Sequence, residues 1–285
     1  MENNKNKVLI TGANGQLGGE FVEIFKDWEV LATDLETLDI TDKAKVKETF
    51  EKEKPDWVIH CAAWTDVDGC AQDPEKAMKI NGEATKNLAE AAKAVSAKMV
   101  YISTNEVFDG KKNSPYIESD ETNPINPYAK SKLAGEKFVQ EILKDDGVIV
   151  RTSWVYGPKG KSNFPLKIIA AADKLGELKV VDDELATPTY APDLAKAVFE
   201  LIQNNPSGIY HLVNDGFASR YDWAEQILKE KKLGVKISRT KLADYQRLST
   251  PPKKAVLANE KYKNLGLKMR SWQNASKEYL TNLPI

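Results

Sequence analysis

Short apolar runs alternate with longer amphipathic stretches along the first half of the chain. The apolar runs fall at residues 7–11, 29–34, 56–63, 98–104 and 147–157. Between them lie stretches with the spacing of helices, the longest at residues 74–95. Runs that are apolar along their whole length are typical of strands covered on both faces, and strands that alternate with helices favour a parallel sheet. The pattern therefore predicts a doubly wound α/β fold with right-handed crossovers.

The second half of the chain is less regular. It contains two expected helices, at residues 189–203 and 219–230, and one expected strand, at residues 208–213. Ser219 and Asp222 form a plausible capping box at the start of the second helix. We expect one domain from residues 1–157, to which about 188–214 return, and a smaller C-terminal lobe from about 158–187 and 215–285. A polar stretch between Thr104 and Tyr128 is expected to be a functional loop.

Composition and charge exclude several classes of function. The 285 residues hold 41 Lys and Arg against 42 Asp and Glu, a net charge of −1, so we expect neither nucleic acid nor a membrane surface as a partner. Apolar runs are too short to span a membrane, and the N-terminus resembles no signal peptide, so a cytoplasmic location is the expectation. Two cysteines provide no disulfide framework and no metal motif. Cys61 is expected to be a buried thiol, and His60 and His211 are expected in the core rather than on a metal.

A glycine-rich turn stands between the first expected strand and the first expected helix. Gly12, Gly15 and Gly18 have the spacing G-x-x-G-x-x-G. Glycines at a helix N-terminus let a pyrophosphate approach unpaired backbone N–H groups, and this motif has the strand and helix that it requires. Asp34 ends the second strand, about 20 residues after the first glycine, where a carboxylate would meet an adenosine ribose. Asp39 and Ile40 follow and are expected near the adenine.

The stretch "NPYAKSKLAGE" places Tyr128 and Lys132 four residues apart, so both side chains can lie on one face of a helix. A tyrosine has a pKa near ~10, and a nearby cation favours its phenolate. The pair would therefore supply a proton donor that works near neutral pH. Y-x-x-x-K also arises by chance on protein surfaces, so the motif gains weight only from its context.

That context resembles the extended short-chain dehydrogenase/reductases. The glycine turn, "CAAWT", "STNEVF" and Y-x-x-x-K occur in the family's order, and "VRTSWVYGP", "VVDDELATPTYAPDLA" and "YHLVNDG" narrow the resemblance to the dTDP-4-dehydrorhamnose reductases. The resemblance covers nearly the whole chain. It implies a Rossmann domain, a sugar-nucleotide-binding lobe, and reduction of the 4-keto group of dTDP-4-dehydro-L-rhamnose to dTDP-L-rhamnose with NADPH or NADH. It also leaves a homodimer open as a partner.

The resemblance implies a role for each matching residue. Thr104, Tyr128 and Lys132 would be catalytic, with Tyr128 as proton donor and Lys132 both lowering its pKa and holding the nicotinamide ribose. Trp154 would lie beside the sugar, although it could equally be a core residue. The residues implied to bind the cofactor are Gly12, Gly15, Gln16, Leu17, Gly18, Asp34, Asp39, Ile40, Ala62, Ala63, Trp64, Thr65, Tyr128 and Lys132, and those implied to bind substrate are Thr104, Asn105, Glu106 and Trp154.

One motif departs from the family. The reductases usually have Thr-Asp-Tyr where this chain has Thr104, Asn105 and Glu106. The related 4,6-dehydratases have Thr-Asp-Glu there, so a dehydratase or an epimerase is one alternative. The regulatory β subunit of methionine adenosyltransferase also resembles these reductases, and a non-catalytic binding role is the other. The complete Thr–Tyr–Lys set favours an enzyme.

Overall fold

The computed structural model describes residues 5–245 and 247–283. Its centre is a parallel sheet of six strands in the order β10-β5-β4-β3-β1-β2. The strands are β1 (Lys7–Thr11), β2 (Glu29–Thr33), β3 (Trp57–His60), β4 (Lys98–Thr104), β5 (Gly147–Thr152) and β10 (Gly208–His211). The order runs outward in both directions from β1 and β3, which confirms the predicted doubly wound fold.

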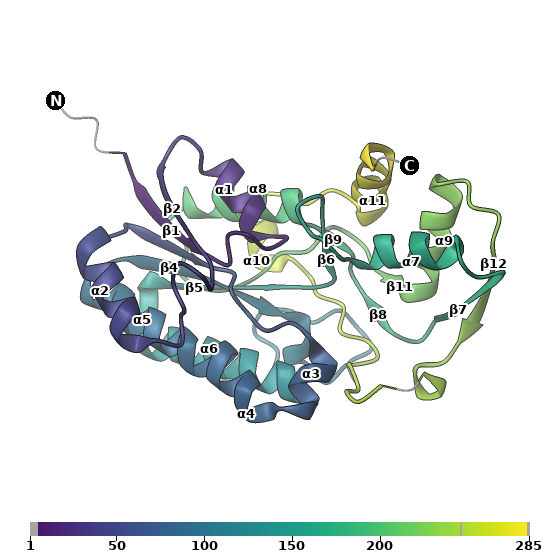
Figure 1. The fold of residues 1–285 in the computed structure, drawn as a ribbon, viewed down its shortest axis with the longest axis horizontal. Coiled ribbons are helices and arrows are strands. Elements are labelled where there is room, and N and C mark those ends of the chain that lie inside the picture. Colours follow the sequence, from purple (N-terminus) through teal and green to yellow (C-terminus); the bar gives the residue numbers. More distant parts are fainter. Residues whose placement is uncertain (1–4, 246, 284–285) are drawn as a thin grey trace.

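Helices cover both faces of this sheet, as Figure 1 shows. One face packs against α1 (Gly18–Ile24) and α8 (Ala191–Ile202), and the other against α2 (Lys43–Glu53), α5 (Ala84–Ala94) and α6 (Pro127–Leu143). Successive side chains of a strand point to opposite faces, so Val8 and Ile10 join the first core while Leu9 joins the second. The continuous apolar runs of the sequence follow from burial on both sides.

The long helical stretch predicted at residues 74–95 is not one regular helix. After α3 (Val67–Gln72), the structure has α4 (Pro74–Ala77), a π-helical turn (Met78–Glu83) and then α5. Inside the turn, the side-chain amide of Asn81 donates to the Trp64 carbonyl at 3.1 Å and accepts from the Trp64 N–H at 2.8 Å. Such turns are frequent at functional sites, and this one fixes the segment that follows β3.

A second group of elements forms a smaller lobe beyond the end of the sheet (Figure 1). It contains α7 (Phe164–Ala172), β7 (Glu177–Val181), α9 (Arg220–Glu230), β12 (Lys236–Thr240) and α11 (Trp272–Asn282), with the short strands β6 (Val155–Tyr156), β8 (Leu185–Ala186), β9 (Thr189–Tyr190) and β11 (Ala218–Ser219). Its core is aromatic and centres on Tyr156, Trp223 and Tyr279. The predicted capping box of Ser219 and Asp222 is present at the start of α9.

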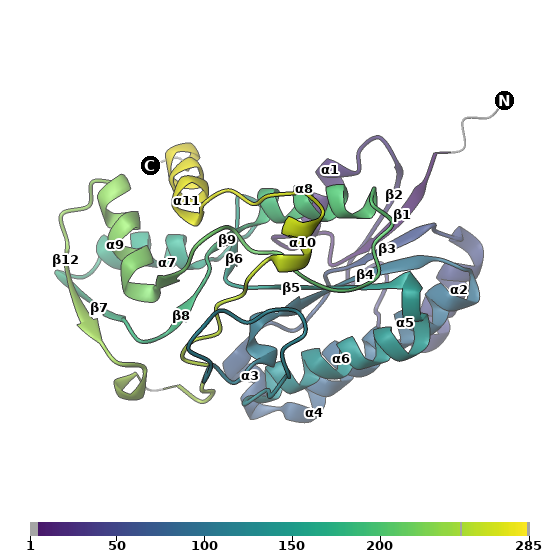
Figure 2. The same ribbon diagram turned by 180° about the vertical axis from the view of Figure 1, so that it is seen from behind.

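The short helix α10 (Glu260–Asn264), although it belongs to the C-terminal third, packs against the sheet and not in the smaller lobe. Its residue Tyr262 is fully buried in the core that α1 and α8 share with the sheet. Figure 2 shows α10 on the same side of the sheet as α8. The chain therefore crosses between the two parts several times, and the domain bounds given above stay a prediction. No helix within residues 5–245 and 247–283 is long and apolar enough to cross a membrane.

Candidate active site

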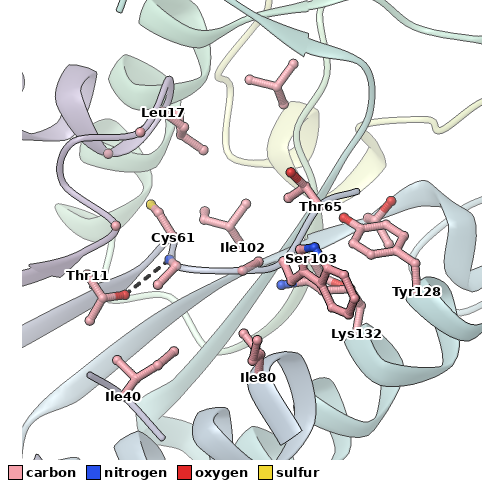
Figure 3. A pocket seen from close by; sticks show the side chains of 18 of the residues that line it. Thr11, Leu17, Ile40, Cys61, Thr65, Ile80, Ile102, Ser103, Tyr128 and Lys132 are labelled. Carbon is pink, nitrogen blue, oxygen red and sulfur yellow. Dashed lines mark hydrogen bonds between the residues drawn. The ribbon is translucent and has the colours of Figure 1, made fainter. Parts of the chain in front are cut away.

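A cleft of about 1270 Å³ opens at the carboxyl ends of the strands. Ligands of doubly wound proteins bind at this edge. Every residue proposed from the sequence to bind cofactor or substrate lines this cleft. Figure 3 shows Leu17 and Ile40 toward one end and Tyr128 and Lys132, both from α6, toward the other. The structure thus brings the predicted residues together, while their individual roles stay predictions.

The glycine turn leaves no room for side chains. Gly12 has φ of +67°, and a Cβ there would lie 2.8 Å from the backbone nitrogen of Ala62. A Cβ at Gly18, where α1 begins, would lie 2.0 Å from the carbonyl oxygen of Gly12. The turn is therefore folded back on itself, with the open N-terminus of α1 at the cleft. This cradle fits a pyrophosphate, whose charge the helix N-terminus favours.

Asp34 binds the glycine turn from the next strand. Its carboxylate accepts hydrogen bonds from the backbone N–H groups of Asn14, at 2.9 Å, and Leu35, at 2.7 Å. A carboxylate has about four lone-pair sites, so it can still accept from a ribose hydroxyl. Asp39 accepts from the backbone and hydroxyl of Thr41, which lowers the pKa of the Asp39 carboxyl.

The side chain of Gln16 connects the glycine turn to the smaller lobe. Its amide nitrogen donates to the Val155 carbonyl at 2.6 Å, and its amide oxygen accepts from Asn163 at 3.2 Å. Asn163 is also the N-cap of α7. Gln16 was predicted to cradle pyrophosphate, and the structure adds this bridging contact between the two parts of the chain.

Thr104, Tyr128 and Lys132 meet at one end of the cleft. Thr104 ends β4, and Tyr128 lies in the first turn of α6, which Asn126 caps by accepting from the Ala129 N–H at 2.8 Å. The Thr104 hydroxyl accepts from the backbone N–H of Glu106 at 3.2 Å and donates a long hydrogen bond to the side-chain oxygen of Asn105, at 3.4 Å. Tyr128 is half-buried and Lys132 is buried, and the two lie one helical turn apart on the same face of α6.

The expected lowering of the tyrosine pKa by Lys132 is wrong for this structure. Burial raises the pKa of the Tyr128 phenol, the Glu106 carboxylate adds to the rise, and Thr104 opposes it. Burial also lowers the pKa of Lys132 to about 7, against the attraction of Glu136. Lys132 Nζ lies over the ring of Tyr101, 4.1 Å from its centroid. Tyr128 is therefore a protonated donor.

Behind Lys132 lies a buried polar cluster that the sequence analysis missed. Glu136, 1% exposed, accepts from the Ser103 hydroxyl at 2.5 Å and from the Arg151 guanidinium at 2.7 Å. Both carboxylate oxygens of Glu136 accept hydrogen bonds, whereas Nη1 of Arg151 is buried without a partner among the described residues. The signal was available, since Glu136 stands four residues after Lys132 in "KLAGE" and so shares its helix face.

Asn105 and Glu106 have different environments. The Asn105 side chain, 4% exposed, donates to the Ala255 carbonyl at 2.9 Å and so joins the end of β4 to the C-terminal third. Glu106 accepts at 2.7 Å from Asn126, which also donates to the Thr250 carbonyl at 3.4 Å. Both residues line the cleft, and Asn105 also serves as a clamp between the end of β4 and the C-terminal third.

Trp154 lines the cleft with a backbone φ of 44°. Its ring stacks on Trp223, with centroids 6.0 Å apart, and the Arg220 guanidinium lies 3.6 Å from its centroid. The indole of Trp154 thus lines the cleft and also packs in the aromatic core of the lobe. The two positions expected from the sequence, at the binding site or in the core, therefore do not exclude each other. Contact with a sugar stays a prediction.

The histidines behave as expected and one cysteine does not. His60 is buried between the hydroxyls of Thr11, at 2.7 Å, and Thr85, at 3.0 Å, and burial lowers its pKa. His211 is fully buried, and burial lowers its pKa to about 3. Cys61 was expected to be buried, but it is only partly buried and lines the cleft (Figure 3). The reason is its position, because β3 ends at His60 and Cys61 is the first residue after the strand.

Fold and cleft together define the class. A doubly wound sheet, a dinucleotide cradle and a Thr–Tyr–Lys group at the carboxyl ends of its strands are those of an NAD(P)-dependent oxidoreductase of the extended short-chain dehydrogenase/reductase class. The RmlD substrate binding domain family matches residues 6–285. The chain therefore belongs to that family.

Individual relatives are similar over nearly the whole chain. The spore coat polysaccharide biosynthesis protein SpsK of Bacillus subtilis is 39% identical, over 96% of each chain. A dTDP-4-dehydrorhamnose reductase of Streptomyces griseus is 37% identical, over 95% of this chain and 91% of the relative. The crystal structure of dTDP-4-dehydrorhamnose reductase from Bacillus anthracis in complex with NADP superposes with a TM-score of 0.94 at 34% identity, covering 98% of this chain and all of the other.

Proposed function

We propose that this protein reduces the 4-keto group of dTDP-4-dehydro-L-rhamnose to dTDP-L-rhamnose with NADPH or NADH. The observation that carries the proposal is the Thr104 hydroxyl and the protonated Tyr128 phenol at the edge of one cleft with the glycine cradle. Relatives named for this reaction support the choice of substrate. On this proposal the smaller lobe binds the nucleotide sugar and the sheet domain the cofactor.

The cofactor supplies hydride to the carbonyl carbon. As hydride arrives, negative charge grows on the ketone oxygen, and the hydroxyls of Thr104 and Tyr128 stabilise that charge by hydrogen bonds. Tyr128 Oη then gives its proton to the oxygen. The raised pKa of this phenol keeps the proton in place before reaction. Lys132, which lines the cleft, would hold the nicotinamide ribose, and the phosphates of a bound cofactor would favour its charged form.

Two residues next to Thr104 have separate proposed roles. Glu106 orients the sugar by accepting hydrogen bonds from its hydroxyls, since its carboxylate lines the cleft. Asn105, which also lines the cleft, positions Thr104 by accepting from its hydroxyl while its own amide nitrogen is held by the Ala255 carbonyl. A 4,6-dehydratase would need an acid at residue 105 to protonate the departing hydroxyl. An amide cannot deliver that proton, so the dehydratase alternative is disfavoured.

The substitution Tyr128→Phe tests the proposed proton donor. It should lower kcat by about 10²–10⁴-fold, the usual contribution of a positioned acid, with little change in cofactor affinity. Cofactor affinity is read from the quenching of tryptophan fluorescence by NADPH, which also shows that the variant is folded. Near-normal turnover of Tyr128→Phe would remove Tyr128 from the mechanism.

A binding role without catalysis is tested by a separate experiment. A protein that acts like the methionine adenosyltransferase β subunit would co-purify with a synthetase and would not consume NAD(P)H with a 4-keto sugar nucleotide. Turnover favours the enzyme. The homodimer and the cytoplasmic location stay predictions.

A further inference from the structure

Glu106 is a carboxylic side chain at the reacting end of the cleft that ketone reduction does not require. Its backbone N–H donates to Thr104 Oγ1 at 3.2 Å, and its Oε2 accepts from the side-chain amide of Asn126 at 2.7 Å. Asn126 in turn caps the helix that carries Tyr128. Hydrogen bonds thus fix Glu106 relative to both groups that bind the ketone oxygen.

The environment of Glu106 makes it a stronger base than an ordinary glutamate. Burial raises the pKa of its carboxyl, and Glu184 adds to the rise, while Asn126, Arg247 and Arg220 oppose it. Among the hydrogen bonds of residues 5–245 and 247–283, the Asn126 amide engages Oε2, and no group donates to Oε1. Because Glu106 lines the cleft, its carboxylate can accept from a group held there.

A ketone held by Thr104 and Tyr128 is acidified at the two carbons beside it. Removing a proton from either carbon moves an electron pair toward the ketone oxygen, so charge grows on the same atom as during reduction. Hydrogen-bond donors that stabilise the alkoxide stabilise this enolate equally. A carboxylate beside the ketone is then the one further group that proton transfer at carbon needs.

We propose that Glu106 removes and returns the proton of a ring carbon beside the ketone, so that the site exchanges this proton with solvent in addition to reducing the ketone. The inference rests on the proposed function, because it needs the ketone to lie against Thr104 and Tyr128. In the forward step the C–H bond breaks, Glu106 takes the proton, a C=C bond forms, and Tyr128 Oη protonates the oxygen. The reverse step returns to carbon a proton that Glu106 has exchanged with water, and no electrons leave the sugar.

The proposed substrate and Asn105 together explain why the process stops at exchange. The substrate is a 6-deoxy sugar, so an enol toward C5 has no hydroxyl at C6 to lose, and an enol toward C3 would lose its C2 hydroxyl only with an acid to protonate it. The residue beside Glu106 is an amide whose nitrogen is committed to the Ala255 carbonyl at 2.9 Å. Because an amide delivers no proton, the enol can only return to the ketone.

The test is carried out in D₂O with dTDP-4-dehydro-L-rhamnose and NADP⁺, which has no hydride to give, so the ketone persists. Deuterium at each ring carbon is followed by NMR. We expect deuterium at one of the two carbons beside the ketone, faster than in a protein-free sample. Glu106→Gln should slow the protein-catalysed exchange by about 10²-fold or more, as expected for loss of a general base.

Reduction is measured on the same preparations with NADPH at saturating ketone. For Glu106→Gln, we expect KM for the ketone to rise more than kcat falls, and exchange to fall far more than reductive kcat. Glu48→Gln, an exposed change on α2, is the matched control and should alter neither rate. Reduction without exchange above the protein-free sample, or equal exchange by Glu106→Gln, would overturn this inference alone. Absence of both reduction and exchange would overturn the proposed function as well.

Discussion

The two ends of the cleft are built in different ways. At the cofactor end, the bond from Asn14 to Asp34 spans 20 residues, and Gln16 reaches Val155 of the smaller lobe across 139. At the sugar end, Asn105 reaches Ala255 across 150 residues, and Ser249 reaches Asp68 across 181. The glycine backbone and Asp34 thus form a local motif, whereas the sugar site depends on how the C-terminal third lies against the sheet. A change at a glycine of the turn or at Asp34 should therefore leave the sugar end largely intact, and a change at Asn105 should leave the glycine turn largely intact.

The largest expected effect comes from filling the glycine turn. Gly18→Ala places a Cβ against the Gly12 carbonyl, and backbone must shift to relieve the contact. Overpacking of this kind costs about 1–3 kcal/mol, so cofactor Kd should rise by about 10–100-fold. The Kd for NADPH is measured by titration calorimetry. Gly176→Ala, where a Cβ meets nothing within 4 Å, is the matched control and should bind normally.

The next effect concerns pH and Lys132. Burial lowers its pKa to about 7, so the ammonium is lost as pH rises through that value. If the ammonium binds the nicotinamide ribose, kcat/KM for the cofactor should fall above pH about 7, approaching about tenfold per pH unit. Lys132→Met should lower kcat/KM and flatten this fall. An unchanged profile in the variant would assign the pH dependence to another group.

Folding stability gives a second readout of Lys132. Between about 7 and the ordinary lysine value of 10.5, the unfolded chain holds a proton that the folded chain does not. Because the unfolded chain binds more protons there, the free energy of unfolding should increase as pH rises through that window. Urea unfolding at several pH values measures the slope, which Lys132→Met should reduce.

A smaller effect is expected at the sugar end. Asn105→Ala removes a buried bond and leaves the Ala255 carbonyl without that donor, which costs about 1–3 kcal/mol of stability. Because the C-terminal third then loses its position, KM for the ketone should rise by about fivefold, the equivalent of about 1 kcal/mol. Cofactor Kd should stay unchanged. The control is Asn204→Ala, which removes an exposed side-chain amide that bonds only to the Glu200 carbonyl among the described residues and should alter neither KM nor cofactor Kd. A shift of cofactor Kd in Asn105→Ala would contradict the independence of the two ends.

An effect of similar size concerns cofactor choice. A carboxylate at residue 34 should repel a 2′-phosphate, so we expect use of both cofactors with a modest NADH advantage, about fivefold for about 1 kcal/mol of repulsion. Asp34→Asn should shift the ratio of kcat/KM values toward NADPH. A strong NADPH preference of the unaltered protein would indicate that a cation such as Lys79, which also lines the cleft, offsets Asp34.

The same contrast explains what the sequence could predict. The sheet followed from apolar runs because strands buried on both faces leave that pattern, and the glycine turn followed from residues that only close backbone approach requires. Neither pattern predicts the hydrogen bond from Asn105 to Ala255, because no local sequence feature indicates that two residues so distant in sequence are partners. The tyrosine pKa was mispredicted for a related reason. Helix spacing gives the position of Lys132 but not the burial that dominates its own charge and that of Tyr128.

The π-helical turn also lay beyond sequence reasoning. Residues 74–95 have the spacing of one helix, with Asn81 and Gly82 as the weak helix formers inside it. The break at Met78–Glu83 places Asn81 where it bonds to Trp64 and to the Ser131 hydroxyl of α6. Those bonds form only after the sheet and α6 have packed. The result is a fixed wall of the cleft that sequence spacing alone does not indicate.

One measurement tests the central claim most directly. Purified protein is given dTDP-4-dehydro-L-rhamnose with NAD(P)H in one sample and dTDP-glucose with NAD⁺ in another, and the products are identified by NMR. We predict consumption of NAD(P)H with formation of dTDP-L-rhamnose in the first sample and no reaction in the second. Formation of the 4-keto-6-deoxy product from dTDP-glucose at catalytic rates, with no reduction of the ketone, would contradict the account.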